Sequence, residues 1–65
     1  MALYEKDGKA ADYGVQTFSG IFDRPYGWAQ RKSDGAYREG PLRWLKIRAR
    51  RDARKLAEGL VASQP

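Results

Sequence analysis

The chain has 65 residues and a formal net charge of +5, with 13 Lys and Arg against 8 Asp and Glu, and it contains neither Cys nor His. A chain this short forms one domain at most and buries only about 60% of the surface that it exposes when unfolded, so its core is thin. The missing residue types exclude disulfides, thiolate and imidazole metal sites, and catalysis by Cys or by a Ser-His-Asp triad.

Other motifs that carry chemistry are also missing from the sequence. Its glycines form neither a phosphate loop nor a dinucleotide-binding pattern, and its aspartates stand mostly in turn-like surroundings, where Asp serves the backbone. We therefore expect no catalytic residue, no metal site and no cofactor. No apolar run reaches the ~18 residues that span a membrane. Residues 1–7 lack the apolar stretch of a secretory signal, so we expect a cytoplasmic protein.

The charge is divided unevenly along what we expect to be a single domain, 1–65. Residues 1–23 hold two basic and four acidic residues, whereas residues 24–65 hold eleven basic and four acidic residues. The densest stretch, 42–55, contains seven Lys and Arg and one acidic residue, Asp52. Such asymmetry indicates a surface for nucleic acid or another anionic partner.

The N-terminal part, 1–23, is predicted to be rich in β-structure. Asp7-Gly8 is a type I′ turn signal that joins a strand at 2–6 to another at 9–13. Residues 15–22 are rich in β-branched and aromatic types and predict a further strand. The stretch 23–27, Asp-Arg-Pro-Tyr-Gly, predicts a turn.

A second hairpin is predicted at Asp34-Gly35, joining 27–33 to 36–39, with Gly40-Pro41 ending the second strand. A two-residue loop sets Arg31 directly opposite Arg38. Like charges in that arrangement are destabilising, and an anion held between the two guanidinium groups reverses the effect. On the neighbouring face, Trp28 and Tyr37 form a diagonal pair that we expect to be a packing contact.

The stretch from Leu42 to Val61 has two interpretations. It is either one helix with Pro41 at its first position, or a strand over 42–49 followed by a helix that Asp52 caps. In the second, which leaves fewer apolar residues on the polar face, Trp44, Lys46 and Arg48 project from the open face of the sheet. In the first, the basic residues form one face of an amphipathic helix, which fits a major groove, an acidic protein or a membrane surface.

Both interpretations place a helix at about 52–62 and predict the same fold class. We expect an α+β fold in which a small antiparallel sheet of three to four strands packs against one C-terminal α-helix. The order of sheet and helix, with Trp44-Leu45 in the last strand and Asp52-Ala53 opening the helix, resembles plant AP2-type and integrase arm-binding domains. Those families place a three-stranded sheet on the major groove.

The run Arg50-Arg51-Asp52-Ala53-Arg54 is similar to the basic start of the last helix in double-stranded RNA-binding domains, where such residues meet phosphates. The N-terminal helix of that family is missing here, since residues 1–20 do not have a helical pattern. Both likenesses cover a short stretch of common residue types, and neither identifies a family.

The sequence thus predicts a small basic nucleic-acid-binding protein without catalytic activity. The residues expected to contact phosphates are those of the 31–38 hairpin and the 43–55 segment: Arg31, Lys32, Arg38, Arg43, Trp44, Lys46, Arg48, Arg50, Arg51, Arg54 and Lys55. The alternative is a protein-interaction module, such as an inhibitor, adaptor or accessory subunit, that uses its aromatic residues and arginines. Nothing in the sequence distinguishes DNA from RNA.

Overall fold

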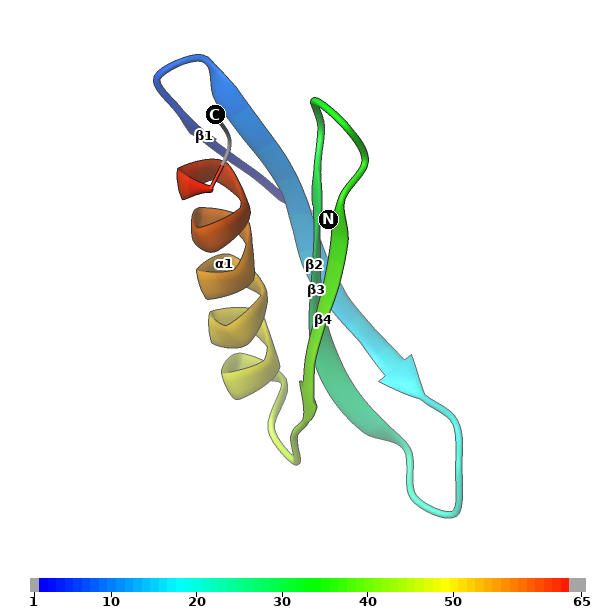
Figure 1. The fold of residues 1–65 in the computed structure, drawn as a ribbon. Helices are drawn as coiled ribbons and strands as arrows, with labels where there is room; N and C mark the ends of the chain where they lie inside the picture. The colour runs from blue at the N-terminus through cyan, green and yellow to red at the C-terminus, as the bar shows by residue number, and fades with distance from the viewer. Residues whose placement is uncertain (1, 64–65) are drawn as a thin grey trace.

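The computed structural model describes residues 2–63, and it confirms the expected α+β fold (Figure 1). The elements are β1 (Ala2–Lys6), β2 (Lys9–Phe18), β3 (Arg24–Arg31), β4 (Tyr37–Leu42) and α1 (Lys46–Ala62). The four strands form one antiparallel sheet in the order β1-β2-β3-β4, so each strand pairs with its neighbours in the sequence. Helix α1 lies along one face of this sheet and leaves the other face open.

The first hairpin forms as predicted. Lys6 pairs with Lys9 across a two-residue turn, and Asp7 and Gly8 have φ angles of 54° and 77°. Gly reaches this left-handed region at no steric cost, and Asp is one of the few other residues that tolerate it. The Asp-Gly signal therefore determines both the place and the register of this turn.

The strand predicted at 15–22 forms only over 15–18, as the end of a longer strand, and the turn predicted at 23–27 is wrong. One long strand, β2, ends at Phe18, and the chain turns within 19–23 before β3 begins at Arg24. Pro25 and Gly27 lie buried within β3, on the side that faces α1. Pro25 lacks an N–H, but its carbonyl accepts a hydrogen bond from the Arg43 N–H at 2.7 Å. Burial of these small residues against the helix outweighs their turn propensity.

The second hairpin turns at the predicted place but in a different register. Ala29 pairs with Arg38 and Gln30 with Tyr37, so residues 32–35 form a four-residue loop. The Asp34 carboxylate accepts a hydrogen bond from the Ala36 N–H at 3.0 Å, which closes the loop on itself. Arg31 therefore does not lie opposite Arg38, and the predicted pair of opposed guanidinium groups is wrong.

Neither interpretation of the segment after Leu42 is correct as stated. Strand β4 continues through Gly40-Pro41 to Leu42, which an edge strand tolerates because one side of it needs no partner. The register shifts opposite Gly27, between Tyr26 and Trp28. Helix α1 begins at Lys46, so Pro41 is not its first residue and Asp52 is not its cap. The strand predicted over 42–49 does not form beyond Leu42.

The core between α1 and the sheet is built from small residues. Its buried apolar residues are Ala11, Ala29, Ala49, Ala53, Ala57, Leu60 and Val61. Ala49, Ala53 and Ala57 recur every four residues and so share one face of the helix. This face lies against Gly27 of β3, the residue at which any added methyl group meets the helix backbone. Among the described residues, no large side chain is fully buried.

The close approach at Gly27 yields a prediction about stability. A Cβ at this position lies against the Ala49 carbonyl oxygen and 2.6 Å from the Ala53 nitrogen, both backbone atoms that cannot move aside without displacing α1. Gly27→Ala is expected to cost about 3 kcal/mol or more of the free energy of unfolding, measured by urea denaturation.

Gly59→Ala is the matched control. A Cβ at Gly59 has no heavy atom within 4 Å, and Gly59 lies inside α1. Alanine there is expected to add about 0.5–1 kcal/mol of stability because Gly weakens a helix interior. Equal effects of the two substitutions would show that the helix is not seated on Gly27.

Candidate nucleic-acid interface

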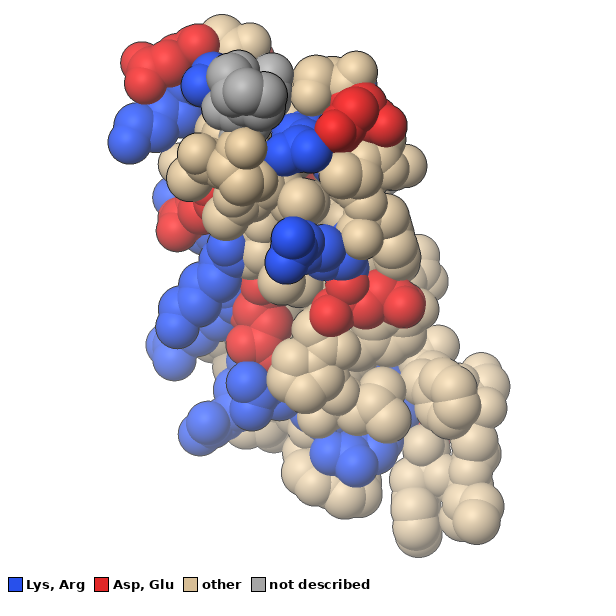
Figure 2. Space-filling model, in the orientation of Figure 1, with Lys and Arg blue, Asp and Glu red and all other residues tan. Residues whose placement is uncertain are grey.

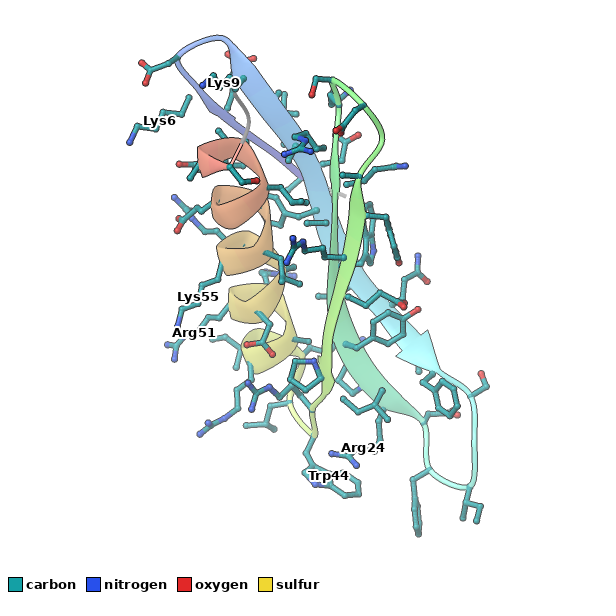
Figure 3. The ribbon with its side chains drawn as sticks, in the orientation of Figure 1. Lys6, Lys9, Arg24, Trp44, Arg51 and Lys55 are labelled. Carbon is teal, nitrogen blue, oxygen red and sulfur yellow. The ribbon has the colours of Figure 1, made fainter. Side chains whose placement is uncertain are left out.

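Three cations line the solvent side of α1. They are Arg48, Arg51 and Lys55, and all three are exposed. Their spacing of three and four residues places them on one face of the helix. Within 2–63, none of them has an ion-pair partner. We call this group the basic ridge. Figure 2 shows Lys and Arg side chains along the edge of the molecule that α1 forms, and Figure 3 shows Arg51 and Lys55 pointing away from the sheet.

A carboxylate beside the basic ridge is already bonded. The Arg43 side chain donates two hydrogen bonds to Asp52, from Nε at 2.6 Å and from Nη2 at 3.1 Å. These bonds raise the pKa of Arg43, because the carboxylate favours its charged form. Arg43 and Asp52 line a shallow hollow together with the three ridge residues. Four cations and one anion surround this hollow, so it is positively charged.

The basic ridge extends toward strand β4 through Arg38. Arg38 is exposed and shares a second hollow with Lys55, so a cation of the sheet lies next to the cations of the helix. Arg54 lies on the other side of the ridge, where its Nε donates to Glu58 at 3.3 Å. This ion pair joins residues four positions apart and is exposed, so it adds little stability. Its two charges cancel each other locally.

Two predicted site residues of the second hairpin serve the fold instead. Arg31 donates two hydrogen bonds to Asp34, at 2.9 and 2.6 Å, and further bonds to the Leu60 carbonyl and the Ser63 hydroxyl. Its side chain is only 13% exposed, and it ties the hairpin to the end of α1. Lys32 lies 3.6 Å from Asp12 of β2. Neither cation belongs to the basic ridge.

Two further predicted residues, Trp44 and Arg50, contact other parts of the molecule than the basic ridge. Arg50 lines a hollow with Tyr13 and Val15, on the side of the helix that faces β2. Trp44 lies in the segment before the helix, with the Arg24 guanidinium 4.1 Å above its ring. The expectation that Trp44, Lys46 and Arg48 project from the open face of the sheet is wrong, because α1 begins at Lys46.

The open face of the sheet is aromatic rather than basic. Trp28 and Tyr37 stack with ring centroids 6.2 Å apart, which confirms the predicted packing pair. Gly14 leaves room for the Trp28 indole, since a Cβ there lies 3.1 Å from the ring. Burial and the nearby Glu39 carboxylate raise the pKa of Tyr37. The cations that a sheet placed on a major groove needs lie mostly on the helix side of the molecule instead.

The sequence analysis missed a second exposed cluster, which we call the apolar tip. It consists of exposed apolar residues: Phe18, Ile21 and Phe22 from the end of β2 and the β2–β3 loop, Trp44 and Leu45 from the segment before α1, and Ile47 from its first turn. The Phe22 and Trp44 rings are in contact, with centroids 6.3 Å apart. The signal that marks it is Ile21-Phe22, an apolar pair between Gly20 and Asp23 that cannot continue a strand into a core.

Residues 2–63 contain no group of three or more acidic side chains placed to hold a metal ion. Across the same range, no helix has both the length and the apolar character that crossing a membrane requires. Comparison of the chain with protein-family models, with curated proteins and with solved structures finds no match. The chemistry of these surfaces therefore carries the functional argument.

The Arg31–Asp34 pair predicts how stability depends on pH. Hydrogen bonds from Arg31 and from the Ala36 N–H lower the pKa of Asp34 to about 2. A carboxyl whose pKa is lower in the folded state stabilises the protein above its unfolded pKa, near 4, and this stabilisation is lost as the pH falls toward about 2. Asp34→Asn is expected to flatten the fall in melting temperature over that acidic range.

Circular dichroism melts of both proteins at stepwise lower pH measure this effect. Asp12→Asn is the control, because Lys32 lies farther from Asp12 than Arg31 lies from Asp34. A parallel fall for native protein and Asp34→Asn would contradict the assigned role of the pair.

Proposed function

We propose that this protein is a nucleic-acid-binding domain without catalytic activity, which binds a phosphate backbone along the basic ridge, with Arg38 beside it. One observation carries the proposal: three exposed cations without ion-pair partners, Arg48, Arg51 and Lys55, share one face of α1. The carboxylate that lines the same hollow, Asp52, already accepts two hydrogen bonds from Arg43.

The length of the basic ridge matches the spacing of phosphates. A helix rises about 1.5 Å per residue, so Arg48 and Lys55 lie about 10 Å apart along its axis. One strand of a duplex carries a phosphate for every 3.4 Å or so of its axis. Laid along the duplex axis, the basic ridge therefore covers about three such steps, which join four successive phosphates, and it offers three cations to them.

The charge pattern of α1 supports an anionic partner rather than simple solvation. The first turn of α1 contains Lys46 and Arg48 and no acidic residue, and Leu45 before it provides no side-chain hydrogen bond. Cations near the positive end of the helix dipole are unfavourable, and an anion bound there offsets the cost. A helix face that only keeps the protein dissolved has no need of this arrangement.

A protein partner is the second candidate, and the open face of the sheet favours it. Tyr37 is half exposed there and stacks on Trp28, and aromatic residues are enriched at the centres of protein interfaces. A partner that is retained after nuclease treatment, and that is lost on Tyr37→Ser but not on Arg51→Gln, would support this second function.

The phosphate contacts predict a salt dependence. If Arg38 and the three ridge residues each neutralise one phosphate of a duplex, log K falls against log[salt] with a slope of about −3 to −4. Arg51→Gln is expected to weaken binding and to reduce the steepness of that slope by about 0.9, because one contact is lost. Fluorescence anisotropy with a labelled duplex at several salt concentrations measures both.

The matched control is Lys6→Gln, which removes one positive charge at the opposite end of the molecule (Figure 3). It is expected to leave the slope as it is in the native protein. Identical slopes for all three proteins would rule out the basic ridge as the phosphate-binding surface. Duplex DNA, duplex RNA and single strands are compared in the same assay to identify the class of nucleic acid.

Asp52→Asn is predicted to change stability and binding in opposite directions. It removes the carboxylate that holds Arg43, so the melting temperature falls. It also adds one unit of positive charge to the hollow beside the basic ridge, so affinity for the duplex rises at low salt. A melting temperature that falls together with the affinity would place Asp52 outside the binding surface.

A further inference from the structure

The apolar tip is too exposed to belong to the core. Ile21 is 95% exposed, Phe22 67% and Trp44 68%. Among the described residues, no large side chain is fully buried, so the core has not taken up side chains of this size. The domain measures 40 × 19 × 17 Å, and the tip lies at one end, where the β2–β3 loop and the start of α1 meet (Figures 1 and 3). This end of the domain therefore offers an apolar surface to a partner.

Cations stand directly behind the apolar tip. Arg24 stacks on the Trp44 ring, and Lys46 lies between Leu45 and Ile47 at the start of α1. Asp23 is the single carboxylate in the two segments 18–24 and 42–48. The tip therefore presents apolar side chains outermost and positive charge immediately behind them.

The apolar tip and the basic ridge face different directions. In Figure 3, Trp44 and Arg24 lie at the lower end of the molecule, whereas Arg51 and Lys55 project from the side of α1. A flat partner in contact with the tip leaves the outer part of the ridge uncovered. The tip is therefore a second surface, and the partner that fits it does not depend on the proposed function.

The chemistry of the tip selects among the possible partners. A second copy of this chain in a symmetric contact brings the same cations together, which is unfavourable. Nucleobases stack on Phe22 and Trp44, but Ile21, Leu45 and Ile47 have no aromatic face to offer them. An anionic bilayer accepts all of these side chains, because hydrocarbon lies behind its negatively charged headgroups and imposes no fixed shape.

We infer that the apolar tip inserts into the interface of an anionic membrane, with the cations behind it at the level of the headgroups. Ile21 and Phe22 enter deepest, since they form the most exposed part of the loop. The Trp44 indole lies at the boundary between headgroups and hydrocarbon, the position that this side chain prefers. The exposed side of α1 then stays available for nucleic acid, so the domain holds a nucleic acid at a membrane surface.

Co-sedimentation with vesicles tests the inference. The full chain is mixed with vesicles of phosphatidylcholine and phosphatidylserine and, in parallel, with vesicles of phosphatidylcholine alone. Binding is expected with the anionic vesicles and is expected to weaken with added salt. The paired substitution Ile21→Ser with Phe22→Ser is expected to lower the partition coefficient by about tenfold or more for each side chain removed.

Leu3→Ser is the matched control, because Leu3 is an exposed apolar residue of β1 outside the tip. It is expected to leave vesicle binding unchanged. The loop substitutions are expected to keep the fold, because neither side chain is buried, and circular dichroism checks this. In a protein with Trp28→Phe, the Trp44 emission is expected to shift to the blue on anionic vesicles only.

Three outcomes would overturn the inference. They are no binding to anionic vesicles, equal binding by the native protein and the paired loop variant, or a concentration-dependent dimer that the loop substitutions abolish. Loop substitutions that weaken oligonucleotide binding and spare vesicle binding would assign the tip to the nucleic-acid surface instead. Arg51→Gln tests the basic ridge separately, so the two proposals fail independently.

Discussion

The contact between α1 and β3 is the constraint from which the rest of the structure follows. Gly27 lies beneath Ala49 and Ala53, and its missing side chain lets the helix backbone approach the strand closely. A layer this thin has room for alanines but for few larger side chains. The packing therefore uses a small part of the apolar residues that the chain contains and leaves the rest on the surface.

Both candidate surfaces are consequences of that thin core. Because alanines recur every four residues on the inner side of α1, its outer side is left for charged residues, and the basic ridge forms there. The thin core has no room for Phe22 or Trp44, and the rings of these two residues, from the β2–β3 loop and the segment before α1, contact each other on the surface instead. Small domains with thin cores gain stability from partners, and these two surfaces are where such partners would bind.

Local signals in the sequence were sufficient for part of the fold. The Asp7-Gly8 turn, the Trp28–Tyr37 pair and the α+β class follow from turn chemistry and residue pattern, and the structure confirms them. The register of the second hairpin was not accessible in this way, because it depends on the Asp34 carboxylate closing a four-residue loop. The bounds of β3 and α1 were also missed, since burial of Pro25 and Gly27 against the helix overrides their turn propensity.

The same limit applies to the candidate site. The charge run in 43–55 covers the helix that carries the basic ridge. Helical periodicity separates Arg48, Arg51 and Lys55 from Arg50, which alternation in a strand does not. That Arg31 and Arg43 are bonded to carboxylates is a tertiary fact, as is the contact between the Phe22 and Trp44 rings. Local patterns report which residues are charged or apolar; the packing decides which of them remain unpaired.

Nuclear magnetic resonance titration with a short duplex, at low and at moderate salt, tests the central claim most directly. We predict that the duplex changes the chemical shifts of backbone amides along the outer side of α1, centred on Arg48, Arg51 and Lys55. These changes are expected to become smaller as salt is raised. Shifts confined to the open face of the sheet around Trp28, or to the hairpin of β1 and β2, would contradict it.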